Sequence, residues 1–98
     1  MTAAAYIFAL LLGLLTGPAA LADGLSPERV RALVERGEIL PLEEILKRNE
    51  SNTGGRIIEV ELERKRGAYV YEIKVLRPDG RYRELEIDAR TGSIVGGK

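Results

Sequence analysis

The sequence predicts an α+β fold, in which an N-terminal helical segment packs on a three- to four-stranded antiparallel β-meander. Three observations predict it. Residues 2–22 carry no charged side chain, so the charged remainder, residues 23–98, is a single small domain. Between residues 26 and 48 apolar side chains recur at the spacing of a helix. From Arg56 onward they alternate with polar ones, at the two-residue period of a strand.

Residues 1–22 have the pattern of a signal peptide. An apolar run over residues 6–15 is followed by the helix breakers Gly17 and Pro18, and then by the small-x-small triplet that ends at Ala22. The pattern predicts cleavage between Ala22 and Asp23 and a periplasmic or secreted domain. The alternative is an uncleaved membrane anchor, since residues 3–22 have about the ~20-residue length of a membrane helix and no Lys or Arg precedes the apolar run. The chain would contact a membrane only in that case.

Cleavage after Ala22 gives a direct prediction. Mass spectrometry of the exported protein should find Asp23 at its N-terminus, because the triplet ending at Ala22 fits signal peptidase. Recovery of the chain with Met1 from the membrane fraction would instead identify the segment as an anchor.

The composition excludes several classes of function. The chain has no cysteine and no histidine, so it lacks disulfides, a thiol nucleophile, the commonest general base and the commonest metal ligand. Its 15 basic and 15 acidic residues balance, which gives no basic surface for nucleic acid. We therefore expect neither catalysis, nor a cofactor, nor a nucleic-acid partner.

The helical segment is predicted to be one bent helix or two short ones. Ser26 and Pro27 are typical of a helix N-cap and first position, and Gly37 of a left-handed end. A second start follows at Pro41, and residues 49–55 are predicted to form a loop. The apolar positions of the two helices are Val30, Leu33, Val34, Leu42, Ile45 and Leu46.

The turns predict the register of the strands. A two-residue turn at Arg66-Gly67 pairs Lys65 with Ala68. It then places Val60 opposite Ile73, and also Ile58 opposite Val75. A three-residue turn over residues 78–80 places Ile73 opposite Leu85, and a short last strand is expected over residues 93–95.

The same register gathers acidic side chains on the outward face of the sheet. Lys74 is the one cation among them, and the carboxylates are those of Glu59, Glu61, Glu63, Glu72, Glu84, Glu86 and Asp88. Three interpretations are open. Arg81 and Arg83 could lean over the face and neutralise it, the face could bind a basic partner, or the row Glu61, Glu72 and Glu86 could hold Ca²⁺.

Several segments resemble one known family. They are the helical end GEILPLEEIL, the strands IIEVELER and YVYEIKVL, the Pro-Asp-Gly turn and the closing RELEIDARTGSIV. Together they resemble the PepSY domain in its small stand-alone periplasmic form. The resemblance implies a non-catalytic module that modulates or inhibits peptidases, and it supplies no catalytic, metal or cofactor residues. Its most specific residues, for which the strand and turn patterns favour structural roles, are Tyr71, Glu72, Asp88, Thr91 and Gly92.

Two functional hypotheses follow. The first is a protein-binding regulator that acts on a peptidase or an envelope sensor protein. The alternative is a small-ligand or cation-binding envelope protein that uses the acidic sheet face. In both cases the candidate binding residues are Glu59, Glu61, Glu72, Glu84, Glu86 and Asp88.

Overall fold

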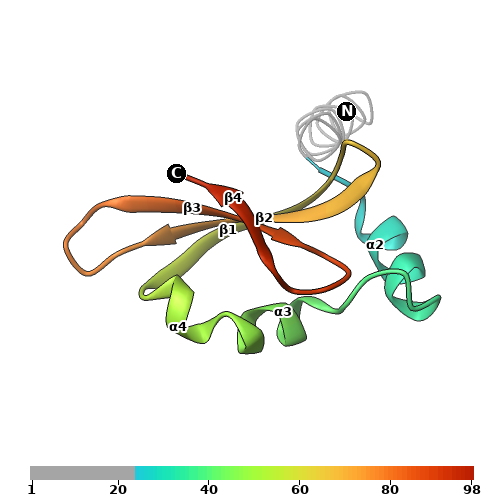
Figure 1. Ribbon diagram of the computed structural model, residues 1–98, viewed down its shortest axis with the longest axis horizontal. Coiled ribbons are helices and arrows are strands. Elements are labelled where there is room, and N and C mark those ends of the chain that lie inside the picture. The colour runs from blue at the N-terminus through green and yellow to red at the C-terminus, as the bar shows by residue number, and fades with distance from the viewer. Residues whose placement is uncertain (1–23) are drawn as a thin grey trace, which may run out of the picture.

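The computed structural model describes residues 24–98, so the predicted signal peptide and its cleavage site lie outside the described residues. These described residues form three helices followed by a four-stranded antiparallel sheet of order β1-β2-β3-β4, with the helices along one side of the sheet (Figure 1). This confirms the predicted α+β class. The elements are α2 (Pro27–Glu35), α3 (Leu42–Arg48), α4 (Glu50–Thr53), β1 (Arg56–Lys65), β2 (Ala68–Leu76), β3 (Tyr82–Asp88) and β4 (Ile94–Gly97).

Helix α2 begins and ends where its sequence predicts. The Ser26 side chain accepts a hydrogen bond from the Arg29 N–H at 3.3 Å, and Pro27 occupies the first turn, where no intrahelical donor is needed. Gly37 has a φ of 72°, and its N–H donates to the Val34 carbonyl while that of Glu38 donates to Leu33. These two bonds satisfy the carbonyls that a helix end leaves unpaired.

The prediction of a loop over residues 49–55 is partly wrong, because Glu50–Thr53 forms the single-turn helix α4. The Asn49 carbonyl accepts hydrogen bonds from the N–H groups of Asn52 and Thr53, and these bonds close the single turn. Gly54, with a φ of 55°, then ends the turn. This short helix was not predicted because its residues are polar and it buries none of its side chains, so the sequence has no apolar period there.

Both hairpins have the predicted turns, and the predicted register is confirmed from Glu59 of β1 through β2 and β3. Arg66 and Gly67 have φ values of 52° and 79°, as a two-residue hairpin turn requires, and Lys65 pairs with Ala68. In the second hairpin the Arg77 N–H donates to the Arg81 carbonyl at 2.8 Å. Ile73 is consequently flanked by Val60 on β1 and by Leu85 on β3.

The start of β1 departs from the prediction. Ile57, and not Ile58, lies opposite Val75, because the register shifts between Ile57 and Glu59. Such a bulge adds one residue to one strand. Ile57 therefore packs against the core, whereas Ile58 is 41% exposed. The prediction was wrong because two adjacent isoleucines fit either register.

The core lies between the helices and the inner face of the sheet. Leu33 and Ile45 contribute from the helices, and the strands contribute Ile73, Val75, Leu85 and Ile87. Tyr71 is also buried here, and its hydroxyl donates to the Leu40 carbonyl at 2.8 Å. Among residues 24–98 no helix has the length and apolar character needed to span a membrane.

Candidate functional site: the acidic face of the sheet

The face of the sheet turned away from the helices carries the predicted carboxylates. Cross-strand rows set Glu61 opposite Glu72 and Glu72 opposite Glu86, as the hairpin register predicts. We call this surface the acidic face and define it by Glu59, Glu61, Glu63, Lys65, Glu72, Lys74, Glu84, Glu86 and Asp88.

Lys65 links three strands of this face. Its Nζ lies 2.6 Å from Glu86 Oε1, 3.1 Å from Glu72 Oε2 and 3.6 Å from Glu63 Oε2. These contacts raise the pKa of Lys65 above its ordinary value, chiefly through the hydrogen bonds to Glu86 and Glu72. One ammonium thus compensates carboxylates from β1, β2 and β3.

Arg83 does not neutralise the acidic face as predicted. It pairs with Val75, which points to the helix side, and its guanidinium donates to the Asn52 carbonyl at 3.1 Å. Lys74 contacts Glu59 at 3.6 Å. We had not predicted that Lys65 compensates these carboxylates. Its position in β1 indicates that role, because Lys65 is two residues beyond Glu63 and therefore lies on the same face of the strand.

The carboxyl groups of Glu63 and Glu72 shift each other's pKa in opposite directions. A hydrogen bond to Glu72, followed by burial and by the charge of Glu72, raises the pKa of Glu63 to about 7. The same hydrogen bond lowers the pKa of Glu72, and Lys65 lowers it further. The protonation of each of these carboxyl groups therefore depends on the other.

One end of the acidic face is hollowed. An open depression of about 680 Å³ lies beside the β1–β2 turn and is lined by Lys65, Arg66, Ala68, Val70, Glu86, Asp88 and Val95. Val70 points outward between Glu63 and Asp88, yet it is only 6% exposed. The depression therefore offers an apolar floor within a charged rim.

The row predicted as a Ca²⁺ site has a different arrangement. The ammonium of Lys65 contacts Glu72 and Glu86, two of the three carboxylates of that row. In the described part of the chain no group of three or more His, Cys, Asp or Glu side chains is placed to hold a metal ion. The acidic face thus presents charge to its surroundings without forming a cation cage.

The two edges of the sheet are interrupted. At β1 the bulge between Ile57 and Glu59 breaks the ladder, and the Leu25 N–H donates to the Leu62 carbonyl at 2.8 Å. At β4 the register shifts between Glu86 and Ile87 of its partner β3. Bulges and covering segments of this kind limit the pairing of further strands.

The turn that contains Asp88, Thr91 and Gly92 is held by local bonds. The Asp88 carboxylate accepts from the N–H groups of Arg90 and Thr91, at 2.8 and 3.1 Å. Gly92 has a φ of 83°, and a side chain there would meet Arg48 at 3.0 Å. These contacts are those of a tight turn, and Tyr71, as described above, belongs to the core.

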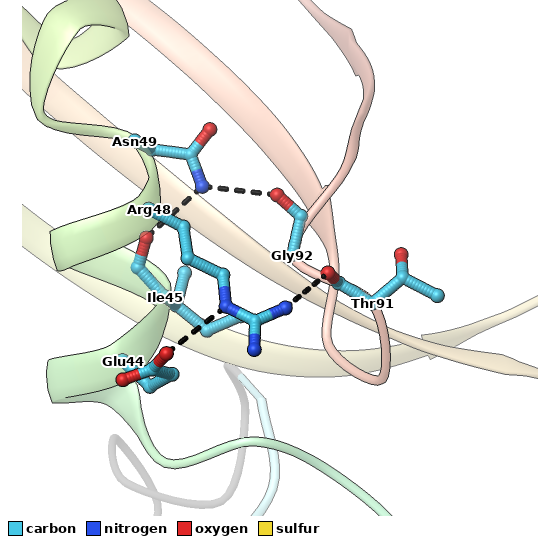
Figure 2. A network of polar contacts seen from close by, with 6 residues as sticks. All are labelled: Glu44, Ile45, Arg48, Asn49, Thr91 and Gly92. Atoms are coloured by element: carbon cyan, nitrogen blue, oxygen red, sulfur yellow. Dashed lines mark hydrogen bonds and ion pairs between the residues drawn. The ribbon is translucent and has the colours of Figure 1, made fainter.

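Figure 2 shows how the same turn is fastened to α3. The Asn49 side-chain amide donates to the carbonyls of Ile45 and Gly92, both at 3.0 Å, and Asn49 is 3% exposed. Arg48 donates to the Thr91 carbonyl at 2.9 Å and to Glu44 at 3.1 Å. The sequence had indicated Asn49 only as a loop residue, since its partner Gly92 is 43 positions away.

The comparisons with known proteins identify the family. The family model described as "Peptidase propeptide and YPEB domain" (PepSY) matches residues 39–98, which span α3, α4 and the whole sheet. Searches of curated proteins and of solved structures found no match. Since the family match covers more than half of the 98 residues, the chain belongs to the PepSY family.

Proposed function

We propose that this protein is a non-catalytic, exported protein-binding module that modulates or inhibits a peptidase or an envelope sensor protein. The observation that carries the proposal is the acidic face, which none of the described elements covers and whose nine defining residues are seven carboxylates and two lysines. Membership of a family named for peptidase propeptides supports a peptidase-related partner. The apolar residues 1–22 support export to the periplasm or the exterior.

The charge of the face specifies the chemistry of the partner. Like charges directly opposite one another, such as Glu61 and Glu72, destabilise a sheet by tenths of a kcal/mol per pair. A basic partner surface would relieve this repulsion, and the negative potential would also speed the encounter. The interrupted edges at Ile57–Glu59 and at β4 make strand addition the less favourable mode.

The ligand-binding alternative has less support. Lys65 already contacts Glu72 and Glu86, so a small cation would have to displace an ammonium at 3.1 and 2.6 Å. The depression beside Val70 is open, whereas small-molecule sites enclose most of their ligand. A macromolecular partner fits a broad charged surface better.

Site-specific photocrosslinking in producing cells tests the proposed surface. A photoreactive residue at Glu59 or Glu84, on the acidic face, should capture one envelope protein, which mass spectrometry identifies. The same residue at Arg36 or Lys47, on the exposed helical side, serves as the matched control and should capture none. Capture mainly from the helical positions, or from none of the four, would contradict the acidic face as the contact surface.

Charge removal then tests the binding energy. We expect Glu59→Gln combined with Glu84→Gln to weaken binding to the captured protein by about five- to thirtyfold, since each exposed charge contributes up to ~1 kcal/mol. Higher salt should weaken wild-type binding more than that of the double variant. If the captured protein is a peptidase, addition of the domain should change its rate of peptide hydrolysis, and a partner whose activity is unaffected would contradict the regulatory role.

A further inference from the structure

The β2–β3 turn forms a basic tip at one end of the molecule. The turn lies at the left end of the long axis in Figure 1, whereas α2 lies at the right. The Arg77 N–H donates to the Arg81 carbonyl at 2.8 Å, so both arginines stand at the base of the turn. Beside them Arg56 of β1 pairs with Leu76, which in turn pairs with Tyr82. We define the basic tip by Arg56, Leu76, Arg77, Arg81, Tyr82 and Arg83.

The positive charge of the basic tip is not compensated. Among residues 24–98, no carboxylate lies within ion-pair distance of its four guanidinium groups. Asp79, the acidic residue of the turn, accepts from the Arg81 N–H at 2.9 Å and so holds the turn itself. The Arg83 guanidinium donates to the neutral Asn52 carbonyl at 3.1 Å. Arg56 and residues 76–83 thus carry four positive charges and one negative charge, in a chain whose net charge is zero.

An exposed aromatic side chain lies among these charges. Tyr82 is 67% exposed, the largest exposed fraction among the large apolar side chains of the described residues. It shares the outward face with Glu84, two residues further along β3, and it neighbours Leu76 across the hairpin. A tyrosine has an apolar ring and a polar hydroxyl, so it suits the boundary between lipid headgroups and acyl chains.

The shape of the basic tip favours a flat partner. The tip is a projecting turn, whereas peptides are bound in grooves or along sheet edges. Guanidinium groups bind phosphate through paired N–H donors and keep their charge at physiological pH. An anionic phospholipid surface presents many phosphates in one plane, and each arginine close to it strengthens binding about fivefold. Charge, aromatic ring and shape thus indicate the same kind of surface.

We propose that the basic tip binds the surface of an anionic phospholipid membrane, with its arginines on headgroup phosphates and the Tyr82 ring among the headgroups. This goes beyond the proposed function, since it concerns another surface and another ligand. It is also separate from residues 1–22, through which alone the sequence predicted contact with a membrane.

The acidic face does not prevent this contact. It begins at Glu84, about 7 Å beyond Tyr82 along β3. In the same row the ammonium of Lys74 contacts Glu59 at 3.6 Å, so a cation lies between the tip and the remaining carboxylates. Because the tip is at the end of the long axis, it meets the lipid first and leaves the acidic face open to a protein partner.

The experiment uses residues 23–98, because the apolar residues 1–22 would bind lipid by themselves and the core lies within residues 24–98. The chain should co-sediment with vesicles of phosphatidylglycerol and phosphatidylcholine in equal parts, and not with phosphatidylcholine alone. Arg77→Gln combined with Arg81→Gln should weaken this binding about ten- to thirtyfold. The matched control, Arg29→Gln combined with Arg31→Gln, removes the same charge from exposed positions of α2 and should weaken binding less than about twofold.

The position of the Tyr82 ring has its own readout. The chain has no tryptophan, so Tyr82→Trp introduces a single indole at the tip. Its fluorescence should shift to shorter wavelength with the anionic vesicles, because the ring leaves water, and should not shift with phosphatidylcholine alone. An unshifted emission from a variant that binds overturns the placement of the ring among the headgroups.

Two further results would overturn the proposal. Equal losses from the two arginine pairs would mean that net charge, and not the tip, governs binding to the vesicles. A chain that ignores anionic vesicles also overturns it. If that chain self-associates in sedimentation equilibrium and the Arg77 and Arg81 changes abolish this, the tip binds a second copy instead. None of these results depends on the protein captured at the acidic face, so the proposed function is tested separately.

Discussion

Replacement of Ile73 by alanine should destabilise the protein by about 2–5 kcal/mol, the usual cost of truncating a buried aliphatic side chain. Ile73 is 0% exposed and lies between Val60 and Leu85, beneath the helices. A cavity here cannot be filled by a shift of one neighbour, because strands on both sides fix the backbone. Urea unfolding, monitored by circular dichroism, measures the loss of unfolding free energy.

Lys74 is the matched control for Ile73, since it is the next residue of β2 and points to the opposite face. Lys74→Ala should cost less than about 1 kcal/mol, because its ion pair with Glu59 is exposed and 3.6 Å long. Equal losses at the two positions would mean that the inward and outward faces of β2 are wrongly assigned.

Asn49→Ala should have the second large effect, a loss of about 2–4 kcal/mol. The change removes the donors to the Ile45 and Gly92 carbonyls and the acceptor for the Asn52 amide. Each hydrogen bond contributes about 0.5–1.5 kcal/mol, and a buried carbonyl left without a partner adds a further penalty. The same urea experiment measures the effect.

Arg48→Ala is the comparison for Asn49. Arg48 bonds to the same turn through the Thr91 carbonyl and also contacts Glu44, but its side chain is 46% exposed. Water can replace its hydrogen bonds, so we expect a loss below about 1 kcal/mol. If the two variants lose equal stability, the burial of Asn49 does not govern the attachment of α3 to the turn.

The sequence predicted most of the fold because the hairpins are local. The turns at residues 66–67 and 78–80 connect strands that are adjacent in the chain, so loop length and alternation together define the register. The bulge at Ile57 could not be predicted, since two consecutive isoleucines fit either register. The attachment of Asn49 to Gly92 was also missed, because it depends on how the helices lie on the finished sheet.

The candidate site was predictable only in its outline. Alternation alone placed the carboxylates on one face, and the cross-strand rows of Glu61, Glu72 and Glu86 confirm that placement. Which cation compensates them depends on how far side chains reach across strands. Lys65 contacts these carboxylates, whereas one interpretation of the sequence had given this role to Arg81 and Arg83. The raised pKa of Glu63 depends on charged neighbours across the strands and on burial, neither of which alternation contains.

The acidic face also makes the distribution of charge along the chain uneven. Of the 15 acidic and 15 basic residues, the face holds seven acidic and two basic ones, which leaves eight acidic and 13 basic residues in the rest of the chain. A protein with zero net charge experiences no net force in a uniform electric field. If its positive and negative charges are separated, however, the field exerts a torque on it. Near an anionic envelope surface it would turn the acidic face outward, toward the solution, within about a Debye length of 8–10 Å at ordinary ionic strength.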